Sequence, residues 1–363
     1  MRADEKIELV IGHYRNGDIM TWEEYKNRFY HYAIYNQKSE EYISKCLNYA
    51  EKLFAKNLPV IYDQNHLSLL VGYKKEYLFK VTNSPAMFYR EFKIPKKNKL
   101  EYRCISEPLP NLKDIQRWIL EHILYKLEPS EYSKAFRKGV SIKDNAKFHR
   151  KQKKVLTIDI KNYFGTISSK SVLKFFLSLG YSTSVSVMLT KLCATDEGLP
   201  QGAPTSPMLA NLITINLDTR LASFANKEKI RYTRYADDLT FSGDFREGYV
   251  IKFVEKVIAS EGFQLNQSKT RVRLQHQKQE VTGIVVNEKL QASRKYRRKF
   301  RQSMFYIRKY GLEAHLKNIG VYDSLSYLYH LIGVANFIRD INKNDSDVYD
   351  DYEYLKELLR KQK

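Results

Sequence analysis

The chain has 363 residues and a formal net charge of +21, from 62 Lys and Arg against 41 Asp and Glu. Its hydrophobic content of 43% excludes a disordered chain, and its length is sufficient for two or three packed subdomains. The excess positive charge favours a polyanionic partner, and the 28 tyrosines and 18 phenylalanines among the bases favour stacking on nucleic acid over a merely solubilising surface.

Cysteine content and hydropathy bear on the compartment of the protein. Cys46, Cys104 and Cys193 lie far apart and form no metal-ligand pattern, which predicts a reducing compartment and no disulfide framework. The N-terminus lacks the apolar segment of a signal peptide, and no run approaches the length of a membrane span. We expect a cytoplasmic protein with no membrane partner.

The first 60 residues carry no catalytic signal, and residues 61–110 contain one informative hairpin. Residues 1–60 place apolar residues at helical spacing and predict helices that form a structural extension rather than a separate functional domain. Residues 61–110 read as short strands and loops. Within them, two β segments at 92–105 flank the polar turn Lys96 to Lys99, which predicts a basic hairpin. On composition alone, this hairpin is a solvated surface element.

A basic segment leads into the first strong strand signal. Residues 111–128 predict an amphipathic helix, and residues 132–154 are rich in Lys and Arg, which favours contact with a nucleic-acid template. Asn145 and His149 lie one helical turn apart within this segment. No Cys or second His supports a metal role for His149, so the alternatives are structural hydrogen bonding and contact with an RNA backbone.

An isolated acid interrupts the apolar strand that follows, Val155 to Ile160. Burial of the unpaired carboxylate of Asp159 would cost several kcal/mol, so the position requires a metal, a basic partner or a raised pKa. Two helices are predicted next, at 168–179 and 183–197. The Gly- and Pro-rich loop 199–207 then turns sharply into a helix predicted at 208–224.

Two adjacent acids lie between β-forming runs in residues 230–243, which predicts a hairpin with Asp237 and Asp238 at its turn. A lone Asp-Asp pair is most often an Asx-type turn. The third acid, Asp159, changes this interpretation because carboxylates on neighbouring strands could hold two divalent ions a few ångströms apart. Oxygen ligands of this kind suit Mg²⁺ or Mn²⁺.

The remainder of the chain reads as one more helix–strand unit and a helical C-terminal region. A helix is predicted at 244–262, strands at 272–274 and from Val281, and helices over 288–363. Residues 294–301 pack six bases and two aromatics, as expected for a helix that lies along a duplex and contacts its phosphates. We expect the acidic stretch Asp345 to Asp351 to be mobile up to the final helix.

Three motifs in order resemble the palm of a reverse transcriptase. They are Tyr235-Ala-Asp-Asp238, Asp159 followed five residues later by Phe164, and Leu199-Pro-Gln-Gly-Ala-Pro-Thr-Ser-Pro207 between them. Two shorter elements, Asn145-Ala-x-x-His149 and Val281-Thr-Gly283, resemble the markers of the retron type. The resemblance implies an α+β right-hand polymerase fold with an antiparallel palm sheet. The segments would be an N-terminal extension (1–60), fingers (61–154, with a junction at 129–154), palm (155–287) and a helical thumb with a C-terminal tail (288–363).

The resemblance also implies roles for individual residues. Asp159 and Asp237 would bind two Mg²⁺ ions, with Mn²⁺ as a substitute, and Asp238 would assist electrostatically or as a further ligand. Phe164 would exclude a 2′-hydroxyl. The nucleotide would further contact Lys96, Arg103, Gln201, Gly202, Tyr235 and Lys269. RNA would contact Asn145, His149, Arg294, Arg297, Arg298 and Arg301.

The implied activity is RNA-templated DNA synthesis from deoxynucleotides. Membership of the retron type would add a structured noncoding RNA that serves as template and, through an internal guanosine 2′-hydroxyl, as primer. The product would be a branched RNA–DNA hybrid, made within an anti-phage system with a separate effector protein. The alternatives are a reverse transcriptase of group II intron or abortive-infection type, and an RNA-binding scaffold with an inactive palm.

Overall fold

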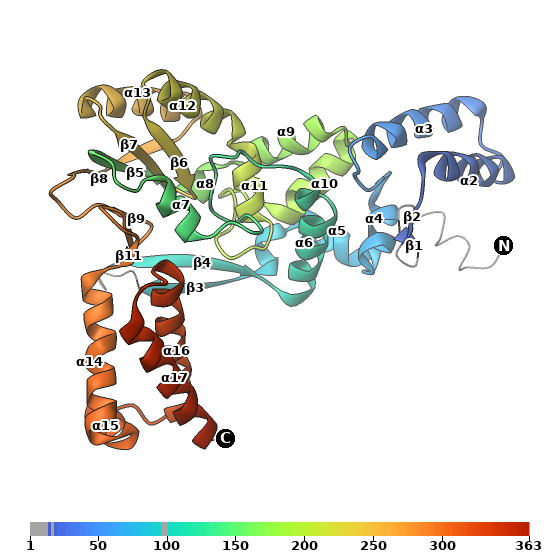
Figure 1. The fold of residues 1–363 in the computed structure, drawn as a ribbon. Coiled ribbons are helices and arrows are strands. Elements are labelled where there is room, and N and C mark those ends of the chain that lie inside the picture. Colours follow the sequence, from blue (N-terminus) through green and yellow to red (C-terminus); the bar gives the residue numbers. More distant parts are fainter. Residues whose placement is uncertain (1–13, 16–17, 96–100, 363) are drawn as a thin grey trace. The chain divides into compact units, whose positions relative to one another are not determined.

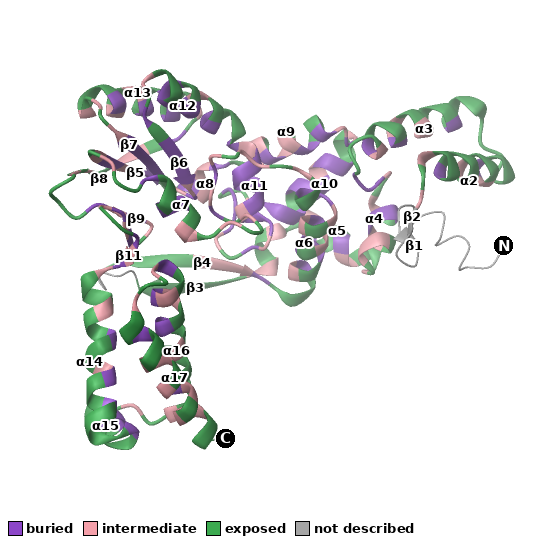
Figure 2. Ribbon diagram, viewed as in Figure 1, coloured by how far each residue is buried: buried purple, intermediate pink, exposed green. Residues whose placement is uncertain are grey.

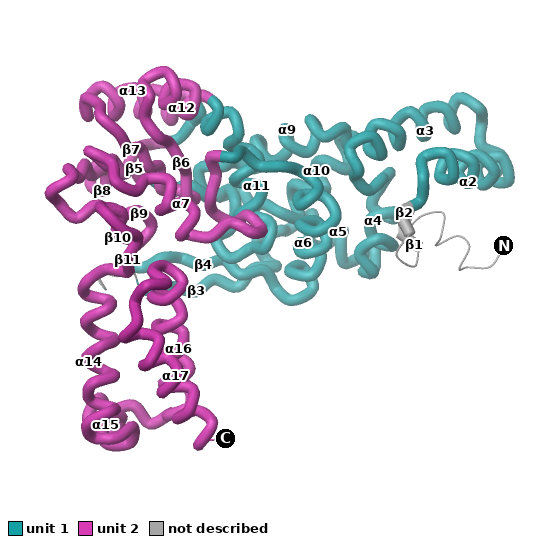
Figure 3. The backbone as a smooth tube through the Cα atoms, viewed as in Figure 1, with its two compact units in different colours: residues 1–131, 161–219, 261–263 teal, residues 132–160, 220–260, 264–363 magenta. Residues whose placement is uncertain are grey.

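The computed structural model describes residues 14–15, 18–95 and 101–362. The chain forms two compact units, each built from separated pieces (Figure 3). Unit 1 comprises residues 1–131, 161–219 and 261–263, and unit 2 comprises residues 132–160, 220–260 and 264–363. The two units are described separately below.

Unit 1 is mostly helical. The apolar spacing of residues 1–60 predicts its first helices, but the expectation of short strands and loops from residue 61 is wrong for residues 64–71 and 75–83, which form helices that each bury apolar residues such as Leu67 and Leu78. Its elements begin with the short strands β1 (Tyr14–Arg15) and β2 (Asp18–Ile19), and its helices are α2 (Trp22–Tyr35), α3 (Glu40–Phe54), α4 (Gln64–Val71), α5 (Lys75–Asn83), α6 (Pro110–His122), α8 (Tyr163–Thr166), α9 (Ser169–Leu179), α10 (Thr183–Cys193) and α11 (Ser206–Ile213), with 3₁₀ turns η1 (Pro85–Phe88) and η2 (Leu124–Lys126). A break at Thr214 divides the single helix predicted at 208–224 into α11 and α12 (Ile215–Lys227).

The predicted basic hairpin is present in unit 1. Strands β3 (Tyr89–Pro95) and β4 (Tyr102–Pro108) pair antiparallel from Tyr89 opposite Pro108 to Pro95 opposite Tyr102. Most side chains of both strands are exposed, including those of Phe92 and Ile94. The predicted turn from Lys96 to Lys99 lies outside the described residues.

Unit 2 contains a four-stranded sheet in the order β6-β7-β5-β8 (Figure 1). The strands are β5 (Lys154–Lys161), β6 (Arg231–Tyr235), β7 (Asp238–Gly243) and β8 (Gln264–Leu274). Strand β7 pairs antiparallel with both β5 and β6. Because side chains alternate between the faces of a strand, one face carries buried apolar residues such as Leu156, Ile158 and Phe241. Helix α13 (Glu247–Ser260) buries its own apolar side beside this sheet.

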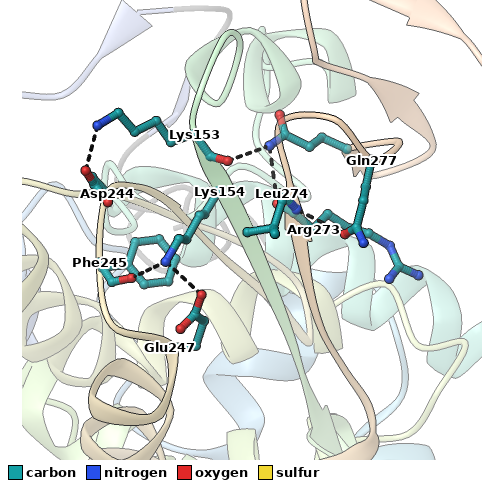
Figure 4. Close-up of polar contacts among 9 residues, drawn as sticks. Lys153, Lys154, Asp244, Phe245, Glu247, Arg273, Leu274 and Gln277 are labelled. Carbon is teal, nitrogen blue, oxygen red and sulfur yellow. Dashed lines mark hydrogen bonds and ion pairs between the residues drawn. The ribbon is translucent and has the colours of Figure 1, made fainter.

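The start of β5 is fastened to the loop that follows β7 (Figure 4). Nζ of Lys153 lies 2.7 Å from the carboxylate of Asp244. Nζ of Lys154 donates to the carbonyl oxygen of Phe245 at 2.9 Å and lies 2.8 Å from Glu247. These contacts secure the end of the sheet that lies away from the acidic residues.

The C-terminal part of unit 2 is a small sheet followed by four helices. Strands β9 (Glu280–Val281), β10 (Ile284–Val285) and β11 (Gln291–Ala292) precede α14 (Arg294–Tyr310), α15 (Leu312–Ile319), α16 (Ser324–Ile341) and α17 (Ser346–Lys361). The buried residues of α14 lie along one side of the helix, at Phe300, Met304 and Ile307 (Figure 2). No helix in the described ranges has the length and apolar character needed to cross a membrane.

The expectation that the acidic stretch 345–351 is mobile is wrong. Helix α17 begins at Ser346, buries Val348 and Leu355, and contacts bases of α14 and α16. Arg308 lies 2.9 Å from Asp351, and the guanidinium of Arg339 stacks on the rings of Tyr349 and Tyr352 at 3.9 and 4.1 Å. An ion pair with α14 and cation–π contacts with α16 therefore order a segment whose composition suggested a solvated tail.

Candidate active site

The structure brings three acidic residues together at one end of the unit 2 sheet. Asp159 on β5 is directly opposite Asp238, the first residue of β7. The amide of Ile160 donates to the carbonyl oxygen of Asp237 at 2.9 Å. Tyr235 also pairs with Asp238, so Asp237 lies in the two-residue turn between β6 and β7. Pairing of β5 with β7 thus gathers acids that are far apart in the sequence.

The turn that presents Asp237 is held in a strained conformation. Ala236 has φ of +57°, in the left-handed region that non-glycine residues seldom adopt. Its carbonyl oxygen accepts a hydrogen bond from the fully buried guanidinium of Arg234 at 3.3 Å. The backbone around Asp237 is therefore set by surrounding contacts rather than by local preference.

A lysine and an asparagine from β8 satisfy the carboxylate of Asp159. Nδ2 of Asn266 donates to Oδ1 at 2.9 Å, and Nζ of Lys269 donates to Oδ2 at 2.7 Å. Only 8% of the Asp159 side chain is exposed, so this pairing removes the penalty of a buried, unpaired charge. The sequence predicted that Asp159 needs a metal, a basic partner or a raised pKa, and the structure provides a basic partner, Lys269.

The three carboxylates influence one another electrostatically. Burial, followed by the negative charges of Asp237 and Asp159, raises the pKa of Asp238 to about 6. The hydrogen bond to Asp159, together with the charges of all three carboxylates, raises the pKa of Lys269 above its usual value. The ammonium group of Lys269 therefore lies in the negative field of the whole cluster.

This cluster fits a divalent ion that shares its coordination with a nucleotide. Its donors are carboxylate oxygens, which Mg²⁺ prefers, and it already attracts one positive group. Across the described residues, no three His, Cys, Asp or Glu side chains form a metal cage by themselves. Mg²⁺ in nucleotide-dependent enzymes is commonly held by one or two carboxylates and completed by water and substrate phosphates, so an incomplete protein shell is consistent with this type of site.

The remaining predicted nucleotide contacts lie in unit 1, except Tyr235 and Lys269. Phe164 is half-buried on α8, and its carbonyl oxygen accepts from the amide of Leu199 at 3.1 Å. The amide of Ser106 donates to the carbonyl oxygen of Gln201 at 2.8 Å, which ties the Gly- and Pro-rich loop to β4. Gly202 has φ of +126°, and a Cβ there would lie 3.0 Å from the Ser106 carbonyl oxygen, so this position favours glycine.

Arg103 and Tyr235, two further predicted nucleotide contacts, differ in how far their side chains are exposed. Arg103 is exposed on β4 opposite Ile94, with its side chain open to an anionic ligand. Tyr235 is half-buried at the end of β6, on the strand pair that carries Asp238. Lys96 lies outside the described residues.

Asn145 and His149 are buried rather than available to RNA. Neither residue has any exposed surface, and both imidazole nitrogens are within 2.7 Å of protein hydroxyls. The predicted RNA contact at these two residues is therefore corrected to the alternative, structural hydrogen bonding. The sequence signal that could have identified this was the position of Asn145 on a short helix and of His149 at its C-terminal end, just before a buried strand.

Helix α14 exposes three of its four predicted RNA-binding arginines. Arg294, Arg298 and Arg301 are exposed on the side away from the buried stripe. Only 25% of the Arg297 side chain is exposed, and its guanidinium lies 3.6 Å from Asp345. This partner is at the start of α17, so contact of Arg297 with RNA would require competition with Asp345.

Comparisons with known proteins agree with the motifs. Residues 94–286 match the family described as reverse transcriptase (RNA-dependent DNA polymerase). The chain is 35% identical over 274 residues to the retron Ec86 reverse transcriptase of Escherichia coli, covering 74% of this chain and 84% of that protein. It is 32% identical over 302 residues to the retron Mx65 reverse transcriptase of Myxococcus xanthus, covering 77% and 68%. It is 31% identical over 312 residues to the retron Se72 reverse transcriptase of Salmonella heidelberg, covering 80% and 81%.

The family match spans more than half of the chain, and the retron relatives match most of it. Reverse transcriptases generally use divalent metal ions, in agreement with the carboxylate cluster of unit 2. The chain therefore belongs to the reverse transcriptase family, is of the retron type with a right-hand polymerase fold, and is an RNA-directed DNA polymerase.

Proposed function

We propose that Asp159, Asp237 and Asp238 are the catalytic carboxylates of this polymerase. Asp159 and Asp237 would hold two Mg²⁺ ions, which Mn²⁺ can replace, and Asp238 would contribute negative charge. When bound, such ions activate the attacking hydroxyl and stabilise the pyrophosphate leaving group. The observation that carries this proposal is the direct pairing of Asp159 with Asp238 beside Asp237.

The protein side chains would position the reactants around this centre. Lys269 would leave Asp159 for the triphosphate of the incoming nucleotide, because two positive groups cannot share one carboxylate oxygen without repulsion. Arg103, with Lys96, would bind the same phosphates through charge-assisted hydrogen bonds. Phe164 would block the space of a 2′-hydroxyl, and Gln201, Gly202 and Tyr235 would line the nucleotide and template base.

We further propose a domain organisation and a substrate. The fingers, palm and thumb would occupy residues 61–154, 155–287 and 288–363, after an N-terminal extension of residues 1–60. A structured noncoding RNA would provide the template and, through an internal guanosine 2′-hydroxyl, the primer, so that the product is a branched RNA–DNA hybrid. The similarity to retron reverse transcriptases supports this substrate. Anti-phage defence, with a separate effector protein in the bacterial cytoplasm, completes the proposal.

The duplex would lie along α14. Arg294, Arg298 and Arg301 are exposed on this helix, where they can reach phosphates and 2′-hydroxyls. Such contacts supply affinity and strong salt dependence but little sequence discrimination. The folded RNA would therefore be selected by its shape more than by its sequence.

Nucleotide incorporation on a synthetic RNA template with a DNA primer and Mg²⁺ tests the site. We expect Asp237→Asn to lower the rate at least about a hundredfold, because the lost charge removes several kcal/mol of metal-dependent stabilisation. The matched control is Asp244→Asn, which removes an exposed acid paired with Lys153 at the other end of the sheet. Equal rates for wild type and Asp237→Asn would remove the site assignment and would favour an inactive RNA-binding scaffold.

The nucleic acid that copurifies with the protein tests the substrate. Recovery of a short RNA joined to DNA through a 2′ branch supports the retron product. Recovery of an intron RNA would instead favour a reverse transcriptase of the group II intron type. Sequencing of the RNA portion would also show which guanosine primes synthesis.

A further inference from the structure

A buried polar network joins the short helix α7 (Ile142–Phe148) to the hairpin β6–β7. Nδ1 of His149 lies 2.7 Å from Oγ of Ser242 on β7, and Nε2 lies 2.7 Å from Oγ1 of Thr233 on β6. Thr233 in turn donates to Oδ1 of Asn145 at 2.6 Å. All four residues have at most 1% of their surface exposed. One imidazole therefore links both strands of the hairpin that carries Asp237.

The hydrogen bonds in this network have a fixed direction. Thr233 has one hydroxyl proton, which it gives to Asn145, so its oxygen accepts from Nε2–H of His149. Nδ1 is then unprotonated and accepts from the hydroxyl of Ser242. Burial, followed by the nearby charges of Arg231 and Lys134, lowers the pKa of His149 to about 3, which keeps the ring neutral. Both nitrogens are occupied, and the ring serves as a connector.

The network lies on the same face of the sheet as the acidic residues. Thr233 is two positions before Tyr235 on β6, and Ser242 is four positions after Asp238 on β7. Because side chains two apart on a strand share a face, these hydroxyls continue the row that ends at the carboxylates of Asp238 and its partner Asp159. Arg231 adds a further contact from β6 by donating to the carbonyl oxygen of Phe148 at 2.6 Å.

A neighbouring side of α7 belongs to the core of the C-terminal region. Ala146 is fully buried in one hydrophobic cluster with Val281 and Ile284 of the three-stranded sheet and with Phe300 of α14. Just after α7, the amide of Lys151 donates to the carbonyl oxygen of Val286 at 3.0 Å. Helix α7 thus contacts strand β6 of the hairpin and strands β9 and β10 of the small sheet, and it shares a hydrophobic cluster with the base of α14, all within unit 2.

We infer that Asn145 and His149 are positioning residues that hold the hairpin bearing Asp237 and Asp238 in a fixed relation to the base of helix α14. This inference rests on the proposed function, in which α14 holds the duplex and the hairpin holds the metal ions. The primer end must then arrive at the carboxylates with sub-ångström accuracy, and a rigid connection between the two elements provides that accuracy. The segments that resemble the retron markers, 145–149 and 281–283, meet at this connection.

A matched pair of substitutions at Thr233 tests the inference. Thr233→Val keeps the shape of the side chain but removes the hydroxyl that accepts from His149 and donates to Asn145, whereas Thr233→Ser keeps the hydroxyl. Pre-steady-state incorporation of one nucleotide on a saturating RNA–DNA primer–template separates the burst rate constant from the burst amplitude. The rate constant measures the geometry of competent molecules, and the amplitude measures how many molecules are competent.

We expect Thr233→Val to lower the burst rate constant about tenfold and Thr233→Ser to stay within about twofold of wild type, because misplacement by a fraction of an ångström slows chemistry strongly. The affinity for the duplex should be unchanged, since α14 is intact. An unchanged rate constant with a reduced amplitude would show a purely structural role and overturn the inference. Equal slowing by both variants would also overturn it.

Two further measurements keep the outcomes separable. If Thr233→Val does not fold, Ser242→Ala removes the hydroxyl at the other imidazole nitrogen with a smaller change in volume, and the same slowing of the rate constant is expected. Wild type and Asp237→Asn are measured in parallel. If the wild type extends no primer, the proposed function is contradicted. If the wild type is active and the network variants have the same rate constant, only the positioning role is contradicted.

Discussion

Replacing Lys269 with methionine tests whether its ammonium group competes with a divalent ion for the acidic cluster. Nζ of Lys269 lies 2.7 Å from Oδ2 of Asp159, and the charges of Asp237 and Asp238 add to its attraction. Methionine retains most of the length of the side chain and removes the charge. The substitution therefore leaves the carboxylates without their basic partner while changing the packing little.

Coulomb's law sets the size of the effect. A single charge and a divalent ion about 5 Å apart repel by about 1.7 kcal/mol in a dielectric near that of water. The Lys269 side chain is 57% exposed and can turn toward solvent, which reduces the repulsion to about 1 kcal/mol. We therefore expect Lys269→Met to bind Mn²⁺ about fivefold more tightly than wild type when no nucleotide is present.

Electron paramagnetic resonance of free Mn²⁺ measures this affinity, and primer extension measures the dNTP concentration for half-maximal rate. The latter should rise in Lys269→Met because a positive group for the triphosphate is lost. The control is Lys153→Met, which breaks an equally short ion pair with Asp244 at the other end of β5 (Figure 4). Weaker Mn²⁺ binding by Lys269→Met, or equal changes in both variants, would refute the competition.

Four other outcomes are expected. Burial and two neighbouring carboxylates raise the pKa of Asp238 to about 6, so isothermal titration of the nucleotide-free protein should show Mn²⁺ affinity falling, with greater proton release, as the pH is lowered from 7 to 5. Phe164→Ala should improve the use of ribonucleotides relative to deoxynucleotides about tenfold or more in single-nucleotide assays; an unchanged ratio would contradict the steric role. Replacement of both Arg298 and Arg301 by Gln should reduce the slope of log affinity against log salt by about 1.5 to 2. His149 takes up a proton below pH 6.5 when the chain is unfolded but only near pH 3 when it is folded. Its contribution to the free energy of unfolding is therefore complete above pH 6.5 and is lower by about 2 kcal/mol at pH 5. Urea titrations of His149→Gln should lack this decline.

Several features of the site could be predicted because they depend on short stretches of sequence. The apolar run around Asp159 and the β-forming runs on both sides of Asp237 and Asp238 predict three strands, and a strand pairs most readily with another whose apolar face matches. The structure has these strands as β5, β6 and β7, with Asp159 opposite Asp238. Most helix positions were also predicted, but α4 and α5 lie where short strands and loops were expected, and the break at Thr214 was not predicted.

The partners of charged residues could not be predicted in the same way. Asn266 and Lys269 reach Asp159 across 107 and 110 positions of sequence, and nothing local to Asp159 indicates which donors will arrive. Arg297 illustrates the same limit, since its sequence neighbours are bases and only the docking of α17 provides Asp345 as a partner. Exposure of a long charged side chain is decided by whatever element packs beside it.

The sequence by itself determined the three strands that carry or flank the acids, the hairpin turn, the order of the motifs and the family, because local composition and short motifs are local properties. Only the tertiary structure decided that Asn145 and His149 are buried connectors instead of RNA contacts, and that the acidic segment 345–351 is ordered. Burial and ion pairing are properties of contacts between distant segments, and those contacts exist only once the chain has folded.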